Sequence, residues 1–429
     1  MCRQFQILCI AALLALTTAT HAQTPCDSTR FNDTLLDKLV GYWDLRGKIG
    51  NREVTNHFSA KWILNHQIME LHFKDTSYEA LVYLGYDCEK HRYVAHWLDI
   101  LGGKYSETLG YGTRTSLSTI AFHFDYPDGP FFNQFIYDAQ QHSWHLHMTS
   151  GNKTWGDEYL TQPYYQAVWF QDYEPFRIAG NLYYVGSYDL ACYLITTPSG
   201  HILINTGIPG SEDMIRKHVE ALGFRFKDIK IVMITHGHFD HVGGVAAIKE
   251  ETGAQVMIGE GDGNVLADGG NSDVIMGGHG PLFEAVMADR FLRDKDSVEL
   301  GGMKILVLHH PGHTKGACSY LFTVKDERRS YRVLIANMPT ILDAVTFPSM
   351  KGYPDVQNDF AYTLDTMRKI QFDLWMASHA NQFDLQAKRK PGDAYHPEVF
   401  GDRAGYEAAL DDLRKAYLKK NTSSPPSSY

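Results

Sequence analysis

The stretch "THGHFDHVGG", from Thr235 to Gly244, places three imidazoles and one carboxylate within six consecutive residues. A lone histidine in a loop usually packs in the core or meets solvent, but this density of ligands is typical of a metal centre. The four side chains are those of His236, His238, Asp240 and His241. The patterns on either side of the stretch indicate which fold presents them.

The ligand stretch lies between a predicted strand and a predicted helix. "DIKIVMI" runs directly into it, and "VGGVAAIKEETGA" follows it with helical periodicity. Further upstream, "LACYLITT" and "HILINTG" flank a "PSG" turn and predict a hairpin. "SEDMIRKHVEALGF" predicts a helix with Ser211 as its N-cap and Gly223 at its end. Strands that alternate with helices indicate an α/β domain, with the four ligands on a strand-to-helix loop.

Two more histidines follow predicted strands in the same way. "MKILVL" leads into "HHPGHTKG", which contains His313, and "FDLWMA" leads into "SHANQ", which contains His379. Each of two sets of three ligands leaves a coordination position open, as catalytic zinc sites do, and imidazole-rich ligation suits zinc better than calcium or magnesium. The sequence therefore predicts two zinc ions per chain. The first set is His236, His238 and His313, and the second is Asp240, His241 and His379.

Other histidines near these patterns have simpler explanations. His309 and His310 adjoin His313, but the ligand spacing does not require them, so a supporting or packing role is favoured. In "HSWHLHMTS", His145 and His147 share one face of a predicted strand. An exposed strand face explains these two better than a metal site does.

The chain is too long for one ordinary core and divides into two domains. Residues 33–163 read as short alternating segments separated by turns, which predicts an all-β barrel or sandwich. Residues 167–421 form the α/β domain, and residues 422–429 are predicted to be a disordered tail.

The first 22 residues have the order of a secretory signal, with Arg3, an apolar run and "THA" before the expected cleavage point. The run is too short to span a bilayer, so we expect a periplasmic or secreted protein without a stable membrane anchor. Of the four cysteines that remain, only Cys26 and Cys88 are candidates for a disulfide, whereas Cys192 and Cys318 lie in apolar strand-like runs. A net charge of −10 disfavours nucleic acid and favours a small-molecule substrate. The number of subunits is left open.

Together, "THGHFDH", "PGHT" and "SH" resemble the metallo-β-lactamase superfamily, over residues 176–418. The resemblance implies an αββα sandwich with its metals at one edge. The ligand set without cysteine is similar to subclass B3, and stretches such as "PFRIAGNLYYVG", "ILINTG", "YRVLIANMP" and "ASHANQFDL" resemble its GOB-type branch. That branch typically has glutamine at the first ligand position, where this chain has His236. The first domain, with "GYW" at 41–43, resembles lipocalin-like barrel domains of uncharacterised function.

The resemblance implies hydrolysis of the β-lactam amide bond by a hydroxide held on the metals, and hence resistance to β-lactam antibiotics. It assigns Asp240 a catalytic role in orienting the water and Thr340 a role in binding the substrate carboxylate, although Thr340 is equally an ordinary loop residue. A lactonase or thioesterase of the same superfamily is the alternative, but the bridging aspartate of such enzymes is replaced here by Asn337 and Met338. A non-catalytic protein whose barrel captures an apolar ligand is a further alternative.

Overall fold

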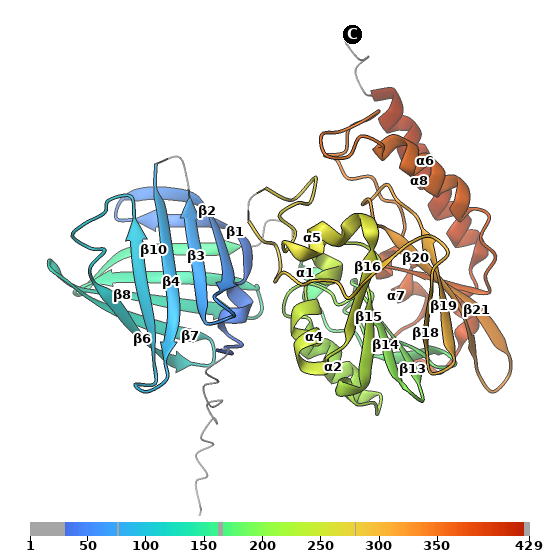
Figure 1. Ribbon diagram of the computed structural model, residues 1–429, viewed down its shortest axis with the longest axis horizontal. Helices are drawn as coiled ribbons and strands as arrows, with labels where there is room; N and C mark the ends of the chain where they lie inside the picture. Colours follow the sequence, from blue (N-terminus) through green and yellow to red (C-terminus); the bar gives the residue numbers. More distant parts are fainter. Residues whose placement is uncertain (1–30, 75–76, 162–165, 279, 424–429) are drawn as a thin grey trace, which may run out of the picture.

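The structure is a computed structural model, and it describes residues 31–74, 77–161, 166–278 and 280–423. The predicted leader and Cys26 lie outside these residues. Two bodies follow each other along the chain, and Figure 1 shows a β-barrel beside a larger domain of sheets and helices.

The first domain is a closed barrel of ten antiparallel strands, in which β1 pairs with both β2 and β10. A short 3-10 helix, η1 (Leu36–Leu39), precedes it. Along each strand, buried and exposed side chains alternate, and the inward set fills the barrel with aromatic rings such as Phe58, Phe122 and Trp144. The all-β barrel prediction is confirmed. The strands are β1 (Gly41–Ile49), β2 (Arg52–Ile63), β3 (Ile68–Lys74), β4 (Glu79–Asp87), β5 (Arg92–Asp99), β6 (Leu109–Ser116), β7 (Thr119–Tyr126), β8 (Gly129–Asp138), β9 (Ser143–Ser150) and β10 (Lys153–Thr161).

The second domain contains two sheets. The seven-stranded sheet has the order β11 to β17, antiparallel from β11 to β14 and parallel from β14 to β17. Its strands are β11 (Phe176–Ala179), β12 (Leu182–Tyr184), β13 (Tyr193–Thr197), β14 (Gly200–Ile204), β15 (Ile229–Met233), β16 (Gln255–Gly259) and β17 (Arg290–Leu292). The five-stranded sheet comprises β18 (Ser297–Leu300), β19 (Met303–His309), β20 (Cys318–Lys325), β21 (Ser330–Ala336) and β22 (Leu374–Ala377).

The helices cover the outer faces of the two sheets. One apolar core lies between the sheets and extends to α6 and α8, while a second packs the seven-stranded sheet against α2 and α4. These layers make an αββα sandwich, so the predicted fold class is confirmed. The α-helices are α1 (Ala167–Phe170), α2 (Glu212–Ala221), α3 (Phe239–Val242), α4 (Val245–Thr252), α5 (Gly263–Ala267), α6 (Val356–Met367), α7 (Leu385–Lys388) and α8 (Arg403–Ser423). The remaining 3-10 helices are η2 (Phe226–Asp228), η3 (Glu260–Asp262), η4 (Ala380–Phe383) and η5 (Pro397–Phe400).

The local patterns around the ligand stretch correspond to observed elements. The predicted hairpin is β13–β14, and α2 has Ser211 at its N-cap position and Gly223 just beyond its end, at a φ of +86° that favours glycine. The ligand stretch differs from the expectation of a plain loop, because Asp240 and His241 lie on the short helix α3. Helix α8 continues to Ser423, two residues into the segment expected to be a tail.

The cysteines fall into two classes. Cys192 and Cys318 are free and buried in the second domain. Cys88 is disulfide-bonded, but Cys26 lies outside the described residues, so the Cys26–Cys88 pair stays a prediction. In the described ranges, no helix is both long and apolar enough to cross a membrane.

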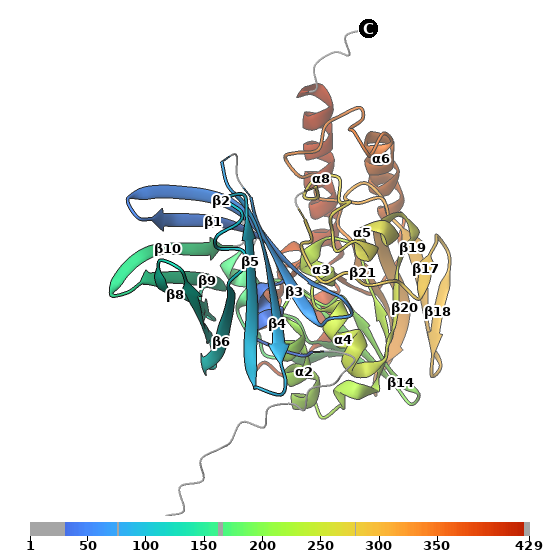
Figure 2. The same ribbon diagram turned by 60° about the vertical axis from the view of Figure 1, so that its left-hand side comes forward.

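The two domains touch through side chains at several points. The His142 ring of the barrel stacks on Phe170 of α1 with 3.4 Å between ring centroids, and His66 Nε2 lies 3.8 Å from Glu284 Oε1 of the second domain. A cavity of about 340 Å³ lies between the domains, with Asp37 and Glu212 among its lining residues. Figure 2 shows the same pair of domains from a second direction.

A candidate metal centre at the edge of the sandwich

The first predicted ligand set converges on one point. His236 and His238 follow β15, and His313 follows β19. Ring centroids are 4.9 Å apart for His236 and His238, and 4.7 Å apart for each of these rings and His313. All three side chains are buried, and their ligand atoms lie within 4.8 Å of one another.

The second set gathers around one carboxylate oxygen. Asp240 Oδ2 lies 3.3 Å from Nε2 of His241 and 3.3 Å from Nε2 of His379, which follows β22. The His241 ring is also 4.2 Å from the His236 ring, so the two sets adjoin. The structure therefore brings together all six residues that the sequence singled out.

Hydrogen bonds to the far side of three rings determine which nitrogen faces the centre. His313 Nδ1 donates to the carbonyl of Thr340 at 2.7 Å, and His379 Nδ1 donates to Asp189 Oδ2 at 3.2 Å, which leaves Nε2 of each ring for a metal. In His238 the arrangement is reversed, because its Nε2 lies 3.2 Å from Asp273 Oδ2. Its Nδ1 is the nitrogen left for a metal.

The remaining two rings have buried nitrogens without hydrogen-bond partners. Nε2 of His236 and Nδ1 of His241 make no hydrogen bond in the described residues. Buried polar atoms without partners are uncommon in native proteins and often indicate an ion. These nitrogens, next to the Asp240 carboxylate, fit zinc.

The electrostatics of the centre favour the metal-binding forms of His236, His313 and Asp240, whereas the carboxylates of Asp189 and Asp240 outweigh burial and raise the pKa of His379 to about 9. Burial and the neighbouring imidazoles hold the pKa of His236 well below its usual value and lower that of His313 to about 3. Burial alone would raise the pKa of Asp240, but the imidazoles of His241 and His379 hold it well below its usual range. Asp240 is therefore ionised at neutral pH.

Hydrogen bonds join the loops that carry the ligands. The buried carboxylate of Asp262 accepts bonds from the backbone N–H of Gly237 at 2.8 Å and of Gly316 at 2.8 Å, and from the Thr314 hydroxyl at 2.6 Å. Ser378 Oγ donates to Thr235 Oγ1 at 3.0 Å, which in turn donates to Asn205 Oδ1 at 3.0 Å. Such supports hold the ligand side chains in fixed geometry.

The other singled-out residues lie close by without being ligands. Thr340 is partly buried beside His313, and its carbonyl fixes that ring. His310 is buried and bonded through Nδ1 to Ser319 Oγ at 2.7 Å, whereas His309 bonds through Nε2 to the Lys315 carbonyl at 2.9 Å. Asn337 is buried directly after β21.

Sequence reasoning missed the three aspartates that orient or support the ligands, namely Asp189, Asp262 and Asp273. Each is an isolated acid in a segment with no ligand spacing, so no pattern distinguishes it. A fourth missed residue is Trp169 on α1, whose Nε1 donates to Asp189 Oδ2 at 3.1 Å and whose ring lies 6.0 Å from that of His379. Only the folded chain brings these residues to the metal centre.

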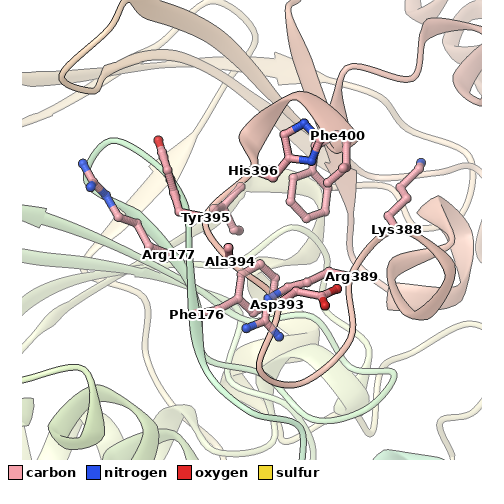
Figure 3. A pocket seen from close by; sticks show the side chains of 11 residues that line it. Phe176, Arg177, Lys388, Arg389, Asp393, Ala394, Tyr395, His396 and Phe400 are labelled. Atoms are coloured by element: carbon pink, nitrogen blue, oxygen red, sulfur yellow. The ribbon is translucent and has the colours of Figure 1, made fainter.

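A separate cavity of about 440 Å³ lies along the edge strand β11, and none of its lining residues is a predicted metal ligand. Figure 3 shows Arg177, Lys388 and Arg389 among the side chains that surround it. Each of these cations already has an acidic partner: Arg177 with Glu327 at 3.0 Å, Lys388 with Asp402 at 3.1 Å and Arg389 with Glu174 at 2.9 Å. The candidate metal ligands thus lie away from this cavity, at the buried imidazoles.

Comparison with known proteins agrees with this geometry. Residues 190–326 match the model of the metallo-β-lactamase superfamily. A β-lactamase from Chitinophaga pinensis is 55% identical and superposes with a TM-score of 0.60, covering 61% of this chain and 98% of its own. The class B3 di-zinc metallo-β-lactamase LRA-12 from an Alaskan soil metagenome is 54% identical (TM-score 0.60, 60% and 98% covered). The metallo-β-lactamase GOB-18 from Elizabethkingia meningoseptica is 50% identical (TM-score 0.59, 60% and 96% covered).

Curated relatives share a shorter region. The hydroxyacylglutathione hydrolase of Pseudomonas aeruginosa is 38% identical over 90 residues, which are 21% of this chain. The matched region spans only 26% of that relative's length. The similarity to the β-lactamase structures is thus both higher and more extensive.

Proposed function

Because the chain belongs to the metallo-β-lactamase superfamily, we propose that it hydrolyses the amide bond of β-lactams with two zinc ions, as a member of subclass B3. The observation that carries this proposal is the convergence of two cysteine-free sets of three ligands at one edge of the sandwich. The identity of 50–55% to β-lactamases that include a B3 di-zinc enzyme supports the same activity.

In this proposal, His236, His238 and His313 hold the first zinc ion, and Asp240, His241 and His379 hold the second. When bound, the two ions supply a nucleophilic water near neutral pH and polarise the lactam carbonyl. The ionised Asp240 accepts a hydrogen bond from the attacking water and so orients it. No serine or cysteine nucleophile is required.

Thr340 is proposed to bind the carboxylate that β-lactam substrates carry. Its hydroxyl Oγ1 lies 3.3 Å from His313 Nδ1, which places it beside the first ligand set. Its side chain is partly exposed, so it can reach a ligand. The carbonyl of the same residue already holds His313, so Thr340 would serve both the ligand geometry and the substrate.

The second candidate function is that of a thioesterase or lactonase, and the similarity to hydroxyacylglutathione hydrolases favours it. The end of β21 argues against it. Asn337 and Met338 stand there, and neither offers the carboxylate that would bridge two metals. The amide hydrolase therefore remains the better-supported activity.

The predicted leader extends the proposal to the biological setting. An exported enzyme would meet β-lactams before they reach their targets, and we propose that it is periplasmic or secreted and confers resistance to these antibiotics.

The test is a turnover assay of the purified protein with nitrocefin, a penicillin, a carbapenem, an acyl-homoserine lactone and a glutathione thioester. We expect β-lactam hydrolysis that EDTA abolishes and zinc restores. His313→Ala should lose the activity, whereas the matched variant His309→Ala, which changes an adjacent non-ligand histidine, should keep it. Activity that survives exhaustive chelation would contradict the mechanism, and turnover of the lactone or thioester alone would establish the second candidate.

A further inference from the structure

The outer wall of the barrel carries a second group of metal-ligand side chains, distant in sequence from the catalytic set. His145 and His147 lie on β9, and Asp157 lies on the neighbouring strand β10. His145 Nε2 is 2.7 Å and His147 Nδ1 is 2.6 Å from the same oxygen, Asp157 Oδ1. Figure 2 labels the two strands on the barrel.

The register of β10 against β9 places the aspartate beside the two histidines. Between Thr154 and Gly156 the register of β10 against β9 shifts by one residue, so Gly156 rather than Trp155 pairs with Met148. From Gly156 onward the side chains alternate between the two faces, with Glu158 and Leu160 buried, so Asp157 lies on the outer face opposite His147.

The surroundings hold the three side chains together and leave them accessible. The His145 ring stacks on Tyr159 with 4.5 Å between centroids and an interplanar angle of 4°. The side chains of His145, His147 and Asp157 are 29%, 30% and 36% exposed. Lys48 of β1 pairs with Asp157 in the sheet, but its ammonium group lies 2.9 Å from Glu53 Oε1, so Lys48 has Glu53 as its acidic partner.

We propose that His145, His147 and Asp157 form a third metal site, which binds a divalent transition-metal ion such as Zn²⁺. Two imidazole nitrogens and one carboxylate oxygen are the same donor types as in the second catalytic set, and this combination suits Zn²⁺, Cu²⁺ or Ni²⁺ better than Ca²⁺ or Mg²⁺. The two ring nitrogens already point at one atom, and the three ligand atoms lie within 4.8 Å of one another. For an ion to bind there, these nitrogens only have to release the protons that they share with Asp157 and coordinate the metal instead.

Solvent exposure distinguishes this site from the catalytic one. Water completes the coordination of an ion held by three partly exposed ligands, so the ion exchanges readily and binds more weakly than in a buried site closed by protein. Hydrogen bonding alone would explain one imidazole beside a carboxylate, and the barrel has such pairs in His72 with Glu79 at 2.8 Å and His123 with Asp125 at 3.1 Å. Only the convergence of two imidazoles makes a chelate.

The experiment measures zinc bound per chain by equilibrium dialysis of the full chain against increasing free Zn²⁺, followed by elemental analysis. We expect the wild-type protein to bind one more ion than His147→Ala at saturation. Asp157→Asn should lower the affinity for that ion at least tenfold. The matched variant His72→Ala, which removes one barrel imidazole paired with a carboxylate, should bind as many ions as wild type. Neither His147→Ala nor His72→Ala should change the turnover of any substrate.

A second measurement identifies the ligands directly. Cu²⁺ added to the zinc-loaded protein should give an electron paramagnetic resonance spectrum with coupling to two imidazole nitrogens, and His147→Ala should lose it. Equal zinc content in wild type and His147→Ala would overturn the proposal, as would a copper spectrum that survives the substitution. The zinc contents of wild type and His147→Ala should differ by the one ion on the barrel. This result does not depend on whether the other metal centre hydrolyses β-lactams.

Discussion

His238 Nε2 lies 3.2 Å from Asp273 Oδ2, and both side chains are 5% exposed. Burial alone would lower the pKa of His238, but the Asp273 carboxylate raises it above the usual value. The same contact fixes the ring so that Nδ1 faces His236 and His313. Asp273 is therefore a positioning residue for the first predicted zinc ion, although it does not bind the ion itself.

We expect Asp273→Asn to weaken zinc binding at the first set by about 10- to 100-fold, the usual effect of losing a carboxylate that orients a metal-binding histidine. Competition with a chromophoric chelator measures this affinity separately from turnover. The matched variant is Asp268→Asn in the same segment, where the carboxylate accepts a bond from the Ser272 N–H at 3.1 Å. Equal affinities in both variants and wild type would contradict a positioning role.

Asp240→Ala tests the assignment of the second ligand set. Its carboxylate is the only acidic group among the six ligands, and it contacts both His241 and His379. The zinc content should fall towards one ion per chain, and most β-lactam turnover should be lost with it. Two tightly bound ions in this variant would show that Asp240 is not a ligand.

The free energy of unfolding should depend on pH through Glu158, an inward-facing residue of the barrel on β10. Burial raises its pKa from the ordinary value of 4.5 to about 7. The folded protein therefore holds this proton more tightly than the unfolded chain does. The resulting stabilisation is complete below about pH 4.5 and is lost as the pH rises through about 7.

Glu158→Gln removes this titration and keeps a neutral side chain of similar shape. Its free energy of unfolding should exceed that of wild type by on the order of 3 kcal/mol at pH 8, and the difference should shrink towards pH 4.5. Thermal unfolding across this pH range measures it. Glu53→Gln, which changes an exposed carboxylate paired with Lys48, is the control and should show no comparable trend. A difference that is constant with pH would rule out Glu158 as its source.

The convergence of the six candidate ligands and the fold class could be predicted from the sequence because both depend on local patterns. Each ligand histidine follows an apolar strand run, and the carboxyl end of that strand determines where the side chain lies. The supporting aspartates could not be predicted, since Asp189 lies 46 residues before the ligand stretch and Asp273 lies 29 residues after it, with no periodicity that marks them.

Asp157 shows a second kind of limit. Its partnership with His145 and His147 depends on the register of β10 against β9, which shifts by one residue between Thr154 and Gly156. Gly156 in "KTWGDEYLT" is a bulge signal, but the strand does not specify which residues of β9 it pairs with. The strand could be predicted there, but not the side chains that its carboxylate meets.

The barrel reaches the metal centre through two segments of the second domain. His142 stacks on Phe170 of α1, and the preceding residue, Trp169, donates to the Asp189 carboxylate that holds His379. The segment 268–288 carries Asp273 towards His238 and Glu284 towards His66 of the barrel. Each segment thus contacts the barrel on one side and a residue that orients a zinc ligand on the other.

We therefore expect the barrel to tune catalysis without supplying it. A shortened chain that begins near Ala167 keeps every predicted ligand, and the β-lactamases similar to it match over 96–98% of their own length with about three fifths of this chain. It should fold, bind zinc and hydrolyse β-lactams, with kcat/KM reduced several-fold through a rise in KM. In the intact chain, Phe170→Ala should reproduce part of that effect, whereas Phe132→Ala, on the exposed outer wall of the barrel, should not. Equal kcat/KM for the shortened and full chains would make the barrel an independent module. A shortened chain that is loaded with zinc but inactive would show that the barrel supplies a residue to the reaction.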